Sequence, residues 1–297
     1  MSIASFISYL SLEKNYSPHT VLAYEKDILD FKDFSTLQFG LTDIDEASYG
    51  LIRTWIISLV ESGISNRSVN RKVASLKAYY KFLLGLEKLT INPLAKHKAL
   101  KIPKKVEVPF SELEMERVLG QVNYGNTFKG KRDKLIIELL YATGIRRAEL
   151  INLKMKDVDL DGNTIKVLGK RSKERIVPLL ELVKQSFLEY EVVRNELNAI
   201  QDEAYVFLSS KGNKIYETLV YRVINRYFSE VSTKVKKSPH ILRHTFATHL
   251  LNKGADLNAV KELLGHSSLA STQVYIHNSI AELKKVHFSA HPRNKKL

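Results

Sequence analysis

Residues 238–277 read SPHILRHTFATHLLNKGADLNAVKELLGHSSLASTQVYIH. This stretch holds five of the nine histidines of the 297-residue chain, with one arginine and one tyrosine. Ser238 and Pro239 are typical of a helix N-cap and first helical position, so we expect a helix to begin here. Its basic residues have i, i+3 and i+4 spacing and should share one face: His240, Arg243 and His244. We expect that face to be cationic and rich in hydrogen-bond donors.

The second half of the stretch predicts two further turns. Gly254 and Gly265 are typical helix stops, and Asp256 should cap a short helix that ends at Leu264. His266 is then the first residue past a tight turn. A segment starting at the next serines carries Tyr275, nine residues after His266. Arginine and histidine donors beside a tyrosine hydroxyl, without a carboxylate pair, favour an anion whose charge grows during reaction, and phosphate fits best.

The charge of the chain is unevenly distributed. The formal net charge is +14, with +2 in residues 1–98 (12 basic, 10 acidic) and +12 in residues 99–297 (34 basic, 22 acidic). Such a field favours a polyanion through counterion release, and nucleic acid is the first expectation. An anionic membrane or an acidic protein could use the same charge.

Composition limits the other classes. The chain has no cysteine, which excludes disulfides, thiolate nucleophiles and cysteine-ligated zinc. The first residues do not resemble a secretory signal, and no apolar run is long enough to span a bilayer. We therefore expect a cytoplasmic protein without a membrane partner.

Apolar periodicity predicts a mainly α fold with two domains. Residues 1–87 contain helical patterns that should form an N-terminal helical domain. Residues 88–108 are rich in lysine and proline with few apolar anchors, which indicates a basic linker. Residues 109–297 should form a catalytic domain of helices with a small antiparallel sheet, in which two strands, 164–168 and 175–178, flank a hairpin tip.

One helix of the first domain has a basic face. Ser65 should cap it, its apolar residues fill a single arc, and no acidic residue occurs from Asn66 to Lys81. We predict that the cations opposite the apolar arc contact DNA: Arg67, Arg71 and Lys81. The alternative is an ordinary solvated helix surface.

Five parts of the sequence resemble one known family. They are Thr143-Gly144-Ile145-Arg146-Arg147-Ala148-Glu149, Lys170 in the hairpin, His240-x-x-Arg243-His244, Leu264-Gly265-His266 and Tyr275. Their order and spacing resemble the tyrosine recombinase (phage integrase) family, and the resemblance covers nearly the whole chain. The compact length and the S-P-x-T opening at residues 17–20 resemble its Xer branch. The resemblance implies that residues 1–87 are a SAM-like, core-binding DNA-binding domain, that residues 109–297 are the catalytic domain, and that the two make a C-shaped DNA clamp.

The resemblance implies a reaction and a set of catalytic residues. Tyr275 would attack a DNA phosphodiester, giving a 3′-phosphotyrosyl enzyme and a free 5′ hydroxyl, with neither ATP, metal nor another cofactor. Arg146 and Arg243 would bind the non-bridging oxygens, a bidentate task for which arginine is suited. His266 would donate a further hydrogen bond to these oxygens, and His240 would assist the phenol as base or hydrogen-bond donor. Lys170 would protonate the 5′ oxygen. Glu149 would orient Arg146.

The resemblance also implies partners and alternatives. Four protomers, identical or of two kinds, would act on two recombination sites to resolve chromosome dimers, with a second Xer-type recombinase and a septal DNA translocase as possible partners. An integrase or transposase of a mobile element would share the chemistry, and a non-catalytic architectural DNA-binding protein would share the charge. His240 and His244 also have the spacing of two metal ligands, but Ile241 occupies the general-base position of that motif and Arg243 would repel a dication.

Overall fold

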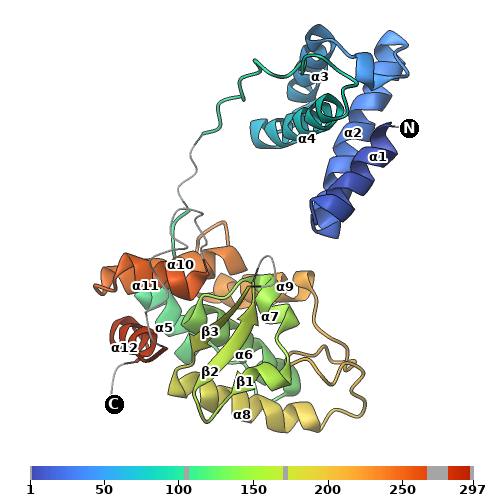
Figure 1. Ribbon diagram of the computed structural model, residues 1–297. Coiled ribbons are helices and arrows are strands. Elements are labelled where there is room, and N and C mark those ends of the chain that lie inside the picture. Colours follow the sequence, from blue (N-terminus) through green and yellow to red (C-terminus); the bar gives the residue numbers. More distant parts are fainter. Residues whose placement is uncertain (1, 104–106, 170–172, 266–279, 295–297) are drawn as a thin grey trace. The chain divides into compact units, whose positions relative to one another are not determined.

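The structure, a computed structural model, describes residues 2–103, 107–169, 173–265 and 280–294. The chain divides into two compact units, Met1–Lys105 and Val106–Leu297, each with its own hydrophobic core (Figure 1). Helices dominate both units, and a three-stranded antiparallel sheet lies in the second. The predicted fold class, mainly α with a small antiparallel sheet, is confirmed.

The first unit is built from helices that pack around aromatic side chains. Ser17 caps α2 by accepting the N–H of Thr20, and Pro18 is its first residue, so this helix begins where the sequence predicts. Gly40 ends it in the left-handed region. The helices are α1 (Ser2–Ser8), the π-helix η1 (Tyr9–Glu13), α2 (Pro18–Phe39), the 3-10 helix η2 (Ile44–Glu46), α3 (Tyr49–Glu61) and α4 (Asn66–Gly85). The fully buried rings include Phe6, Phe31, Tyr79 and Tyr80.

The start of the expected linker is packed on the first unit. Leu94 is fully buried in its core and is one of the few apolar anchors of residues 88–108. Asn70 on α4 exchanges two hydrogen bonds with the backbone of Leu100, at 2.8 and 2.9 Å, and Asn66 donates to the carbonyl of Lys101 at 2.9 Å. These side-chain amides bind backbone groups of the segment, much as a neighbouring strand would. The segment is therefore fixed to the first unit as far as Lys101.

The second unit is arranged around α6, which is buried along nearly its whole length. α6 packs against α5, α7, α8, α9 and α10. Ser111 and Glu114 form a capping box at the start of α5. The helices before the C-terminal group are α5 (Glu112–Gly120), α6 (Phe128–Thr143), α7 (Arg147–Asn152), the 3-10 helix η3 (Met155–Asp157), α8 (Glu181–Asn195) and α9 (Glu217–Val231).

The sheet contains the two predicted strands and a short third one. β1 (Val158–Asp159), β2 (Thr164–Leu168) and β3 (Glu174–Pro178) pair antiparallel in the order β1-β2-β3. Ile165 is paired with Val177, and both side chains are buried in the core of the second unit. The alternate residues of β2 are exposed, as the two-residue period of a half-buried strand requires.

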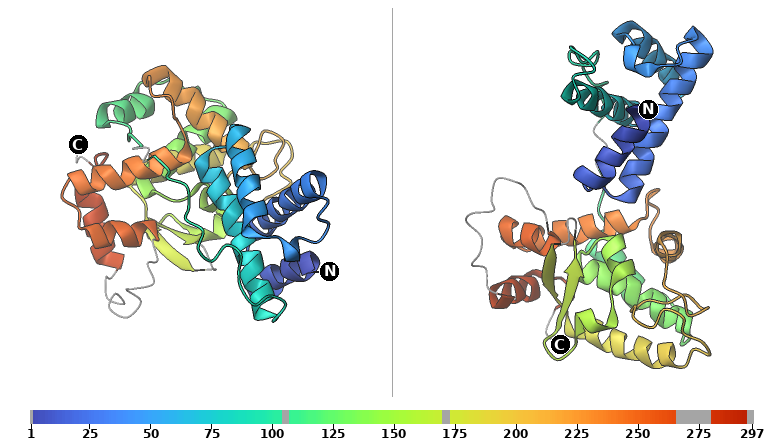
Figure 2. Two further views of the ribbon diagram at one scale, coloured as in Figure 1. Left: turned by 90° about the horizontal axis from the view of Figure 1, so that it is seen from above. Right: turned by 45° about the vertical axis from the view of Figure 1, so that its right-hand side comes forward.

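Three helices complete the second unit: α10 (Pro239–Asn252), α11 (Leu257–Leu264) and α12 (Ile280–Ala290). Ser238 caps α10, Asp256 caps α11 and Gly265 ends α11 in the left-handed region, all as predicted. α12 packs against α10, α11 and β3 (Figure 2). These helices share a small core around Phe246, Leu250, Leu263 and Leu264.

Candidate active site

The site begins at the turn that ends α6. Gly144 has a φ of 61°, in the region that favours glycine, and a Cβ atom at this position would overlap the ring of Phe246. The turn leads directly into α7, so Arg146 lies at the N-cap position of that helix. Its guanidinium is about one third exposed, with Nη2 donating to the carbonyl of Gly265 at 3.2 Å.

Arg243 reaches the same turn from α10. Its Nη1 donates to the carbonyl of Gly144 and its Nη2 to the carbonyl of Leu264, both at 2.6 Å. The residue is only 8% exposed. Burial, together with the positive charge of Arg146, lowers the pKa of Arg243 to about 10. The side chain therefore remains charged at neutral pH, and an anion beside it would be favourable.

Glu149 joins this pair to the sheet. One carboxylate oxygen accepts the backbone N–H of Arg146 at 2.7 Å and the other accepts its Nη1 at 2.8 Å. Arg175 on β3 donates to both oxygens, at 2.9 and 2.8 Å. Burial alone would raise the pKa of Glu149, but the hydrogen bonds from Arg175 and Arg146 outweigh it and hold the pKa below the usual value. The expected contact between Glu149 and Arg146 is therefore present.

Arg175 is a residue that the sequence did not single out. Its Nε also donates to the carbonyl of Leu263, at 2.9 Å, so one side chain connects β3, α7 and the end of α11. The signal in the sequence is an arginine at the start of the apolar run Ile176–Val177 in an otherwise half-buried strand. A cation in that position requires a buried acceptor, which is supplied here by Glu149.

His240 lies at the opening of the site. Its side chain is 75% exposed, and its Nε2 is 3.4 Å from a carboxylate oxygen of Glu107, which also binds Lys236. His244 is exposed as well, whereas Arg243 points inward. His240 and Arg243 both line one cavity, in line with the predicted shared face, but the guanidinium of Arg243 is directed inward, to the carbonyls of Gly144 and Leu264.

These side chains border an open cavity of about 490 Å³. Its lining residues are Arg146, Arg147, Tyr221, Ser238, Pro239, His240 and Arg243. The structure therefore brings together three of the predicted catalytic residues, from α7 and α10, around a space large enough for a phosphodiester group. Three others, Lys170, His266 and Tyr275, lie outside the described residues.

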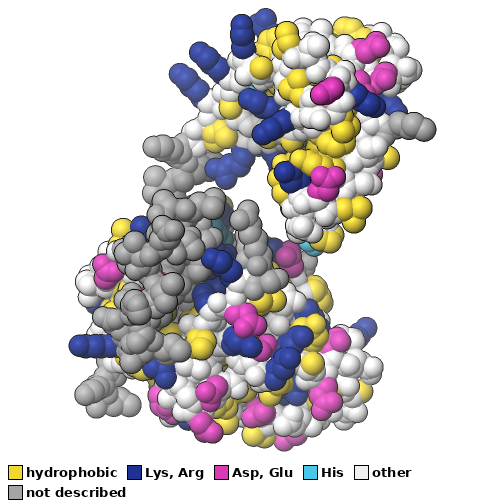
Figure 3. All heavy atoms as spheres, in the orientation of Figure 1, with side chains coloured by type: hydrophobic (Ala, Val, Ile, Leu, Met, Phe, Trp, Pro, Cys, Tyr) yellow, Lys and Arg dark blue, Asp and Glu magenta, His cyan; other side chains and the backbone are white. Residues whose placement is uncertain are grey.

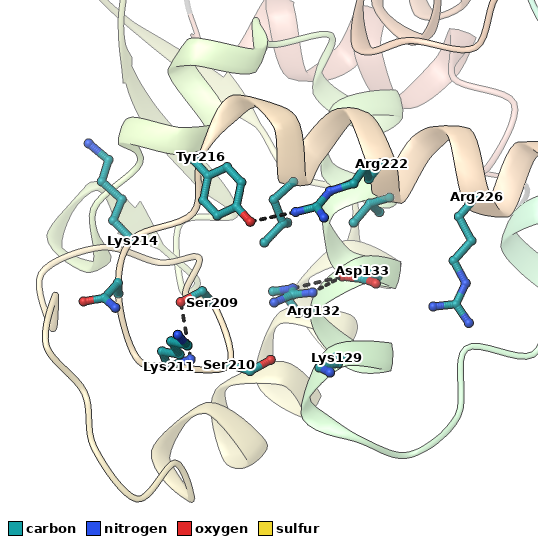
Figure 4. Close-up of a pocket in the computed structure, with 13 residues that line it drawn as sticks. Lys129, Arg132, Asp133, Ser209, Ser210, Lys211, Lys214, Tyr216, Arg222 and Arg226 are labelled. Carbon is teal, nitrogen blue, oxygen red and sulfur yellow. Dashed lines mark hydrogen bonds and ion pairs between the residues drawn. The ribbon is translucent and has the colours of Figure 1, made fainter.

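A second basic cavity, of about 640 Å³, lies between the start of α6, the loop 209–214 and α9 (Figure 4). Its one acidic residue, Asp133, is held by Arg132 through two hydrogen bonds, at 2.9 and 2.7 Å. In Figure 4 the guanidinium of Arg222 points toward the hydroxyl of Tyr216, to which it donates at 2.6 Å. The cations that line this cavity are Lys129, Arg132, Lys211, Lys214, Arg222 and Arg226. The basic and aromatic residues of α9 are evident in the sequence, but a local pattern cannot place the cations of the loop beside them.

The three predicted DNA contacts on α4 differ in their surroundings. Arg67 and Lys81 are exposed, as are many lysines and arginines of this unit (Figure 3). Arg71 is exposed as well, but it also binds the carboxylate of Asp27, a residue that is only 1% exposed. Arg71 therefore forms an ion pair within the first unit, which Arg67 and Lys81 are not seen to do among the described residues.

Two further findings concern the described residues only. They contain no group of three or more histidine, cysteine, aspartate or glutamate side chains arranged to hold a metal ion, so the alternative role of His240 and His244 as metal ligands gains no third ligand there. None of the helices in this part of the chain is both long enough and apolar enough to cross a bilayer.

Comparison with known proteins assigns the class. Residues 109–282 match the model of the phage integrase family, and residues 3–85 match the phage integrase N-terminal SAM-like domain. The chain therefore belongs to the phage integrase family, the tyrosine recombinases.

Two curated relatives in that family are named tyrosine recombinase XerC. The tyrosine recombinase XerC of Chlorobaculum parvum is 38% identical, covering 97% of this chain and 93% of its own, and that of Bacillus pumilus is 40% identical, covering 97% and 95%. Among solved structures, the XerH site-specific recombinase bound to palindromic difH substrate is similar with a TM-score of 0.73, at 22% identity over 96% of this chain and 83% of that one. The Xer branch expected from the sequence is thus confirmed.

Proposed function

We propose that this chain cuts and rejoins DNA at specific sites through a covalent bond to Tyr275, and that it resolves chromosome dimers. In the first step the phenolic oxygen attacks phosphorus and the bond to the 5′ oxygen breaks. The products are a 3′-phosphotyrosyl enzyme and a 5′ hydroxyl. Rejoining is the reverse step with a new 5′ hydroxyl, so the phosphoester bond energy is retained.

One observation carries this proposal: three separate parts of the sequence meet at one point. Arg243 binds the carbonyls of Gly144 and Leu264, and Arg146 binds the carbonyl of Gly265. The two guanidiniums are therefore anchored to the residues that directly precede His266 in the chain. Fixed donors of this kind stabilise negative charge that develops on non-bridging oxygens, because they need no reorganisation during the reaction.

The remaining roles follow from the chemistry of a phosphodiester. Arg146 and Arg243 bind the non-bridging oxygens, and His266 donates a further hydrogen bond to them. His240, exposed at the mouth of the cavity, assists the phenol of Tyr275. Lys170, in the hairpin between β2 and β3, protonates the departing 5′ oxygen.

DNA is held by both units in this proposal. Residues 1–87 act as the core-binding domain through Arg67, Arg71 and Lys81, residues 88–108 connect it to the catalytic domain at 109–297, and the two domains close on the duplex as a C-shaped clamp. The cations of the second cavity supply further phosphate contacts beside the catalytic site. Four protomers then act on two sites in the cytoplasm, with a second recombinase and a DNA translocase as partners.

The experiment that tests the reaction uses a nicked duplex carrying the recombination site. Mixed with the protein in EDTA, it should give a protein–DNA complex that survives SDS, because the reaction needs no metal. Tyr275→Phe should abolish this complex with little change in DNA affinity. Tyr221→Phe, which alters the tyrosine that lines the cavity, is the matched control and should still form it. An architectural DNA-binding protein would form no such complex.

The biological target needs a separate experiment. Mapping of the cleaved positions across the host genome should find one site in the terminus region of the chromosome. Cleavage confined to the ends of a mobile element would replace chromosome-dimer resolution with integration, while the chemistry would stay the same.

A further inference from the structure

Two buried histidines of the C-terminal segment cap the end of α6. His287 on α12 donates from Nε2 to the carbonyl of Ala142 at 2.6 Å, and His291 donates from Nε2 to the carbonyl of Tyr141 at 3.2 Å. The last carbonyls of an α-helix have no partner within the helix. Here imidazoles from another part of the chain satisfy two of them.

The hydrogen bonds define the protonation state of both rings. A carbonyl oxygen only accepts, so each Nε2 must carry a proton. The Nδ1 of His291 accepts the backbone N–H of Arg293 at 3.3 Å and therefore has none. The Nδ1 of His287 is buried and has no partner among the described residues. Both imidazoles are therefore neutral, and a second proton on either would have no acceptor.

Burial gives the same result. It lowers the pKa of His287 to about 4. Burial, together with the neighbouring His287, lowers the pKa of His291 well below the usual value. The centroids of the two rings are only 5.4 Å apart, so protonating both would place like charges side by side.

The surroundings of the two rings are largely aromatic and neutral. Tyr141 on α6 lies against His291 and is hydrogen-bonded to His249 on α10, whose pKa is also lowered by burial. Glu138 on α6 binds Arg293 at 3.0 Å. The other charged residues on the elements that pack against α12 are Arg243 on α10 and Lys253 at its C-cap, Lys261 and Glu262 on α11, and Glu174 and Arg175 on β3.

Phe246 connects these histidines to the candidate active site. Its ring centroid is 6.0 Å from those of both His287 and His291. The same ring lies against Gly144, where it leaves no space for a Cβ atom. The carbonyl of Gly144 binds Arg243, and Arg146 is two residues further along. Movement of α12 would therefore remove support from the turn that places both guanidiniums.

We propose that neutral His287 and His291 form a proton-sensitive clamp that holds α12 on the end of α6 and thereby positions Arg146 and Arg243. Histidine in an undocked segment has a pKa of about 6.5. Because docking lowers the pKa, the clamp is fully formed above that value and loosens as the pH falls toward 4. Each histidine then favours release by about tenfold per pH unit. The effect on catalysis rests on the function proposed above, whereas the docking equilibrium does not.

Amide hydrogen exchange of the full-length protein at pH 7.5 and 5.5 measures docking directly, with exchange times scaled for the intrinsic rate. Protection of residues 284–290 should fall about tenfold or more at the lower pH, while that of α8 should not change. In the double variant His287→Gln/His291→Gln the amide can donate in place of Nε2–H but takes no proton, so the pH dependence should disappear. His249→Gln, the control for the third histidine, should retain it.

Equal protection of α12 in the wild type at both pH values would overturn the clamp. So would a double variant that keeps the wild-type pH dependence. A double variant that is unprotected at both pH values would show that the imidazoles are needed as caps, which supports the clamp. In that case the pH dependence of the wild type decides whether protonation of the histidines releases α12.

The rate of covalent complex formation at saturating DNA tests the positioning role. Between pH 7.5 and 5.5 it should fall more steeply in the wild type than in the His287→Gln/His291→Gln variant. If the rate falls equally steeply with pH in both proteins, His287 and His291 do not position Arg146 and Arg243. Absence of covalent complex in every protein would instead contradict the proposed function, and hydrogen exchange would still decide whether the clamp exists.

Discussion

Arg175 holds Glu149 with both terminal nitrogens of its guanidinium, at 2.9 and 2.8 Å, inside the second unit. The carboxylate is only 6% exposed and binds Arg146 at the same time. The position of Arg146 therefore depends on a side chain from β3. Removing one member of such a buried network leaves uncompensated charge, which costs far more than the loss of an exposed ion pair.

We expect Arg175→Ala to destabilise the second unit by about 3–5 kcal/mol, because Glu149 loses its bidentate partner. Chemical unfolding followed by circular dichroism measures this. The one tryptophan, Trp55, is buried in the first unit, so its fluorescence should report an unchanged transition there. Arg222→Ala, which removes an exposed arginine, is the control and should cost less than about 1 kcal/mol. A similarly small effect for Arg175→Ala would contradict the role of the network.

Arg243→Lys should slow formation of the covalent complex by about 10²–10³-fold, equivalent to about 2.7–4 kcal/mol. A lysine ammonium is a single donor group and cannot bind the carbonyls of Gly144 and Leu264 and also present a planar fork to a phosphate. Single-turnover kinetics at saturating DNA gives the rate. Wild-type kinetics in this variant would show that the bidentate geometry is not needed.

Arg67→Ala and Lys81→Ala should each weaken DNA binding and reduce the slope of log K against log salt by about 0.9. Both side chains are exposed, so the stability of the first unit should hardly change. Binding titrations at several salt concentrations measure the slope, and Lys26→Ala on α2 provides a comparison. If the slope is unchanged in both variants, these cations do not contact DNA, and α4 has the ordinary solvated surface that is the alternative interpretation.

Arg71→Ala should behave differently because Arg71 binds Asp27, which is almost fully buried. Asp27 would keep Ser75, at 2.8 Å, and the more distant Lys72, at 3.4 Å. We expect a loss of roughly 1–3 kcal/mol in the free energy of unfolding of the first unit. The fluorescence of Trp55 during denaturation measures it. If the stability is unchanged, the ion pair with Asp27 does not stabilise the first unit, and DNA binding would be the one role left for Arg71.

Local chemistry explains which parts of this structure could be predicted. Ser111 with Glu114, Ser238 with Pro239, and Gly265 act within a few residues of their own positions, and each helix end lies where these residues place it. A hydrophobic period of two was enough to find β2 and most of β3.

Contacts between distant residues could not be predicted in this way. Arg175 reaches Leu263, 88 residues away, and Arg71 reaches Asp27, 44 residues away, so neither partner is visible in a local pattern. Leu94 is one of several apolar residues in a basic segment that contains prolines, and only the core of the first unit shows that it is a fully buried anchor. The inward direction of Arg243 likewise depends on carbonyls that the folded Gly144 turn exposes.

The central claim is that DNA becomes joined to Tyr275, and peptide mapping of the covalent complex by mass spectrometry tests it most directly. After nuclease and protease digestion, the peptide that contains Tyr275 should carry a nucleotide through a 3′-phosphotyrosyl bond. The same peptide should be unmodified when Tyr275→Phe is mixed with the same DNA. A nucleotide on any other residue, or a wild-type complex without a modified tyrosine, would contradict the account.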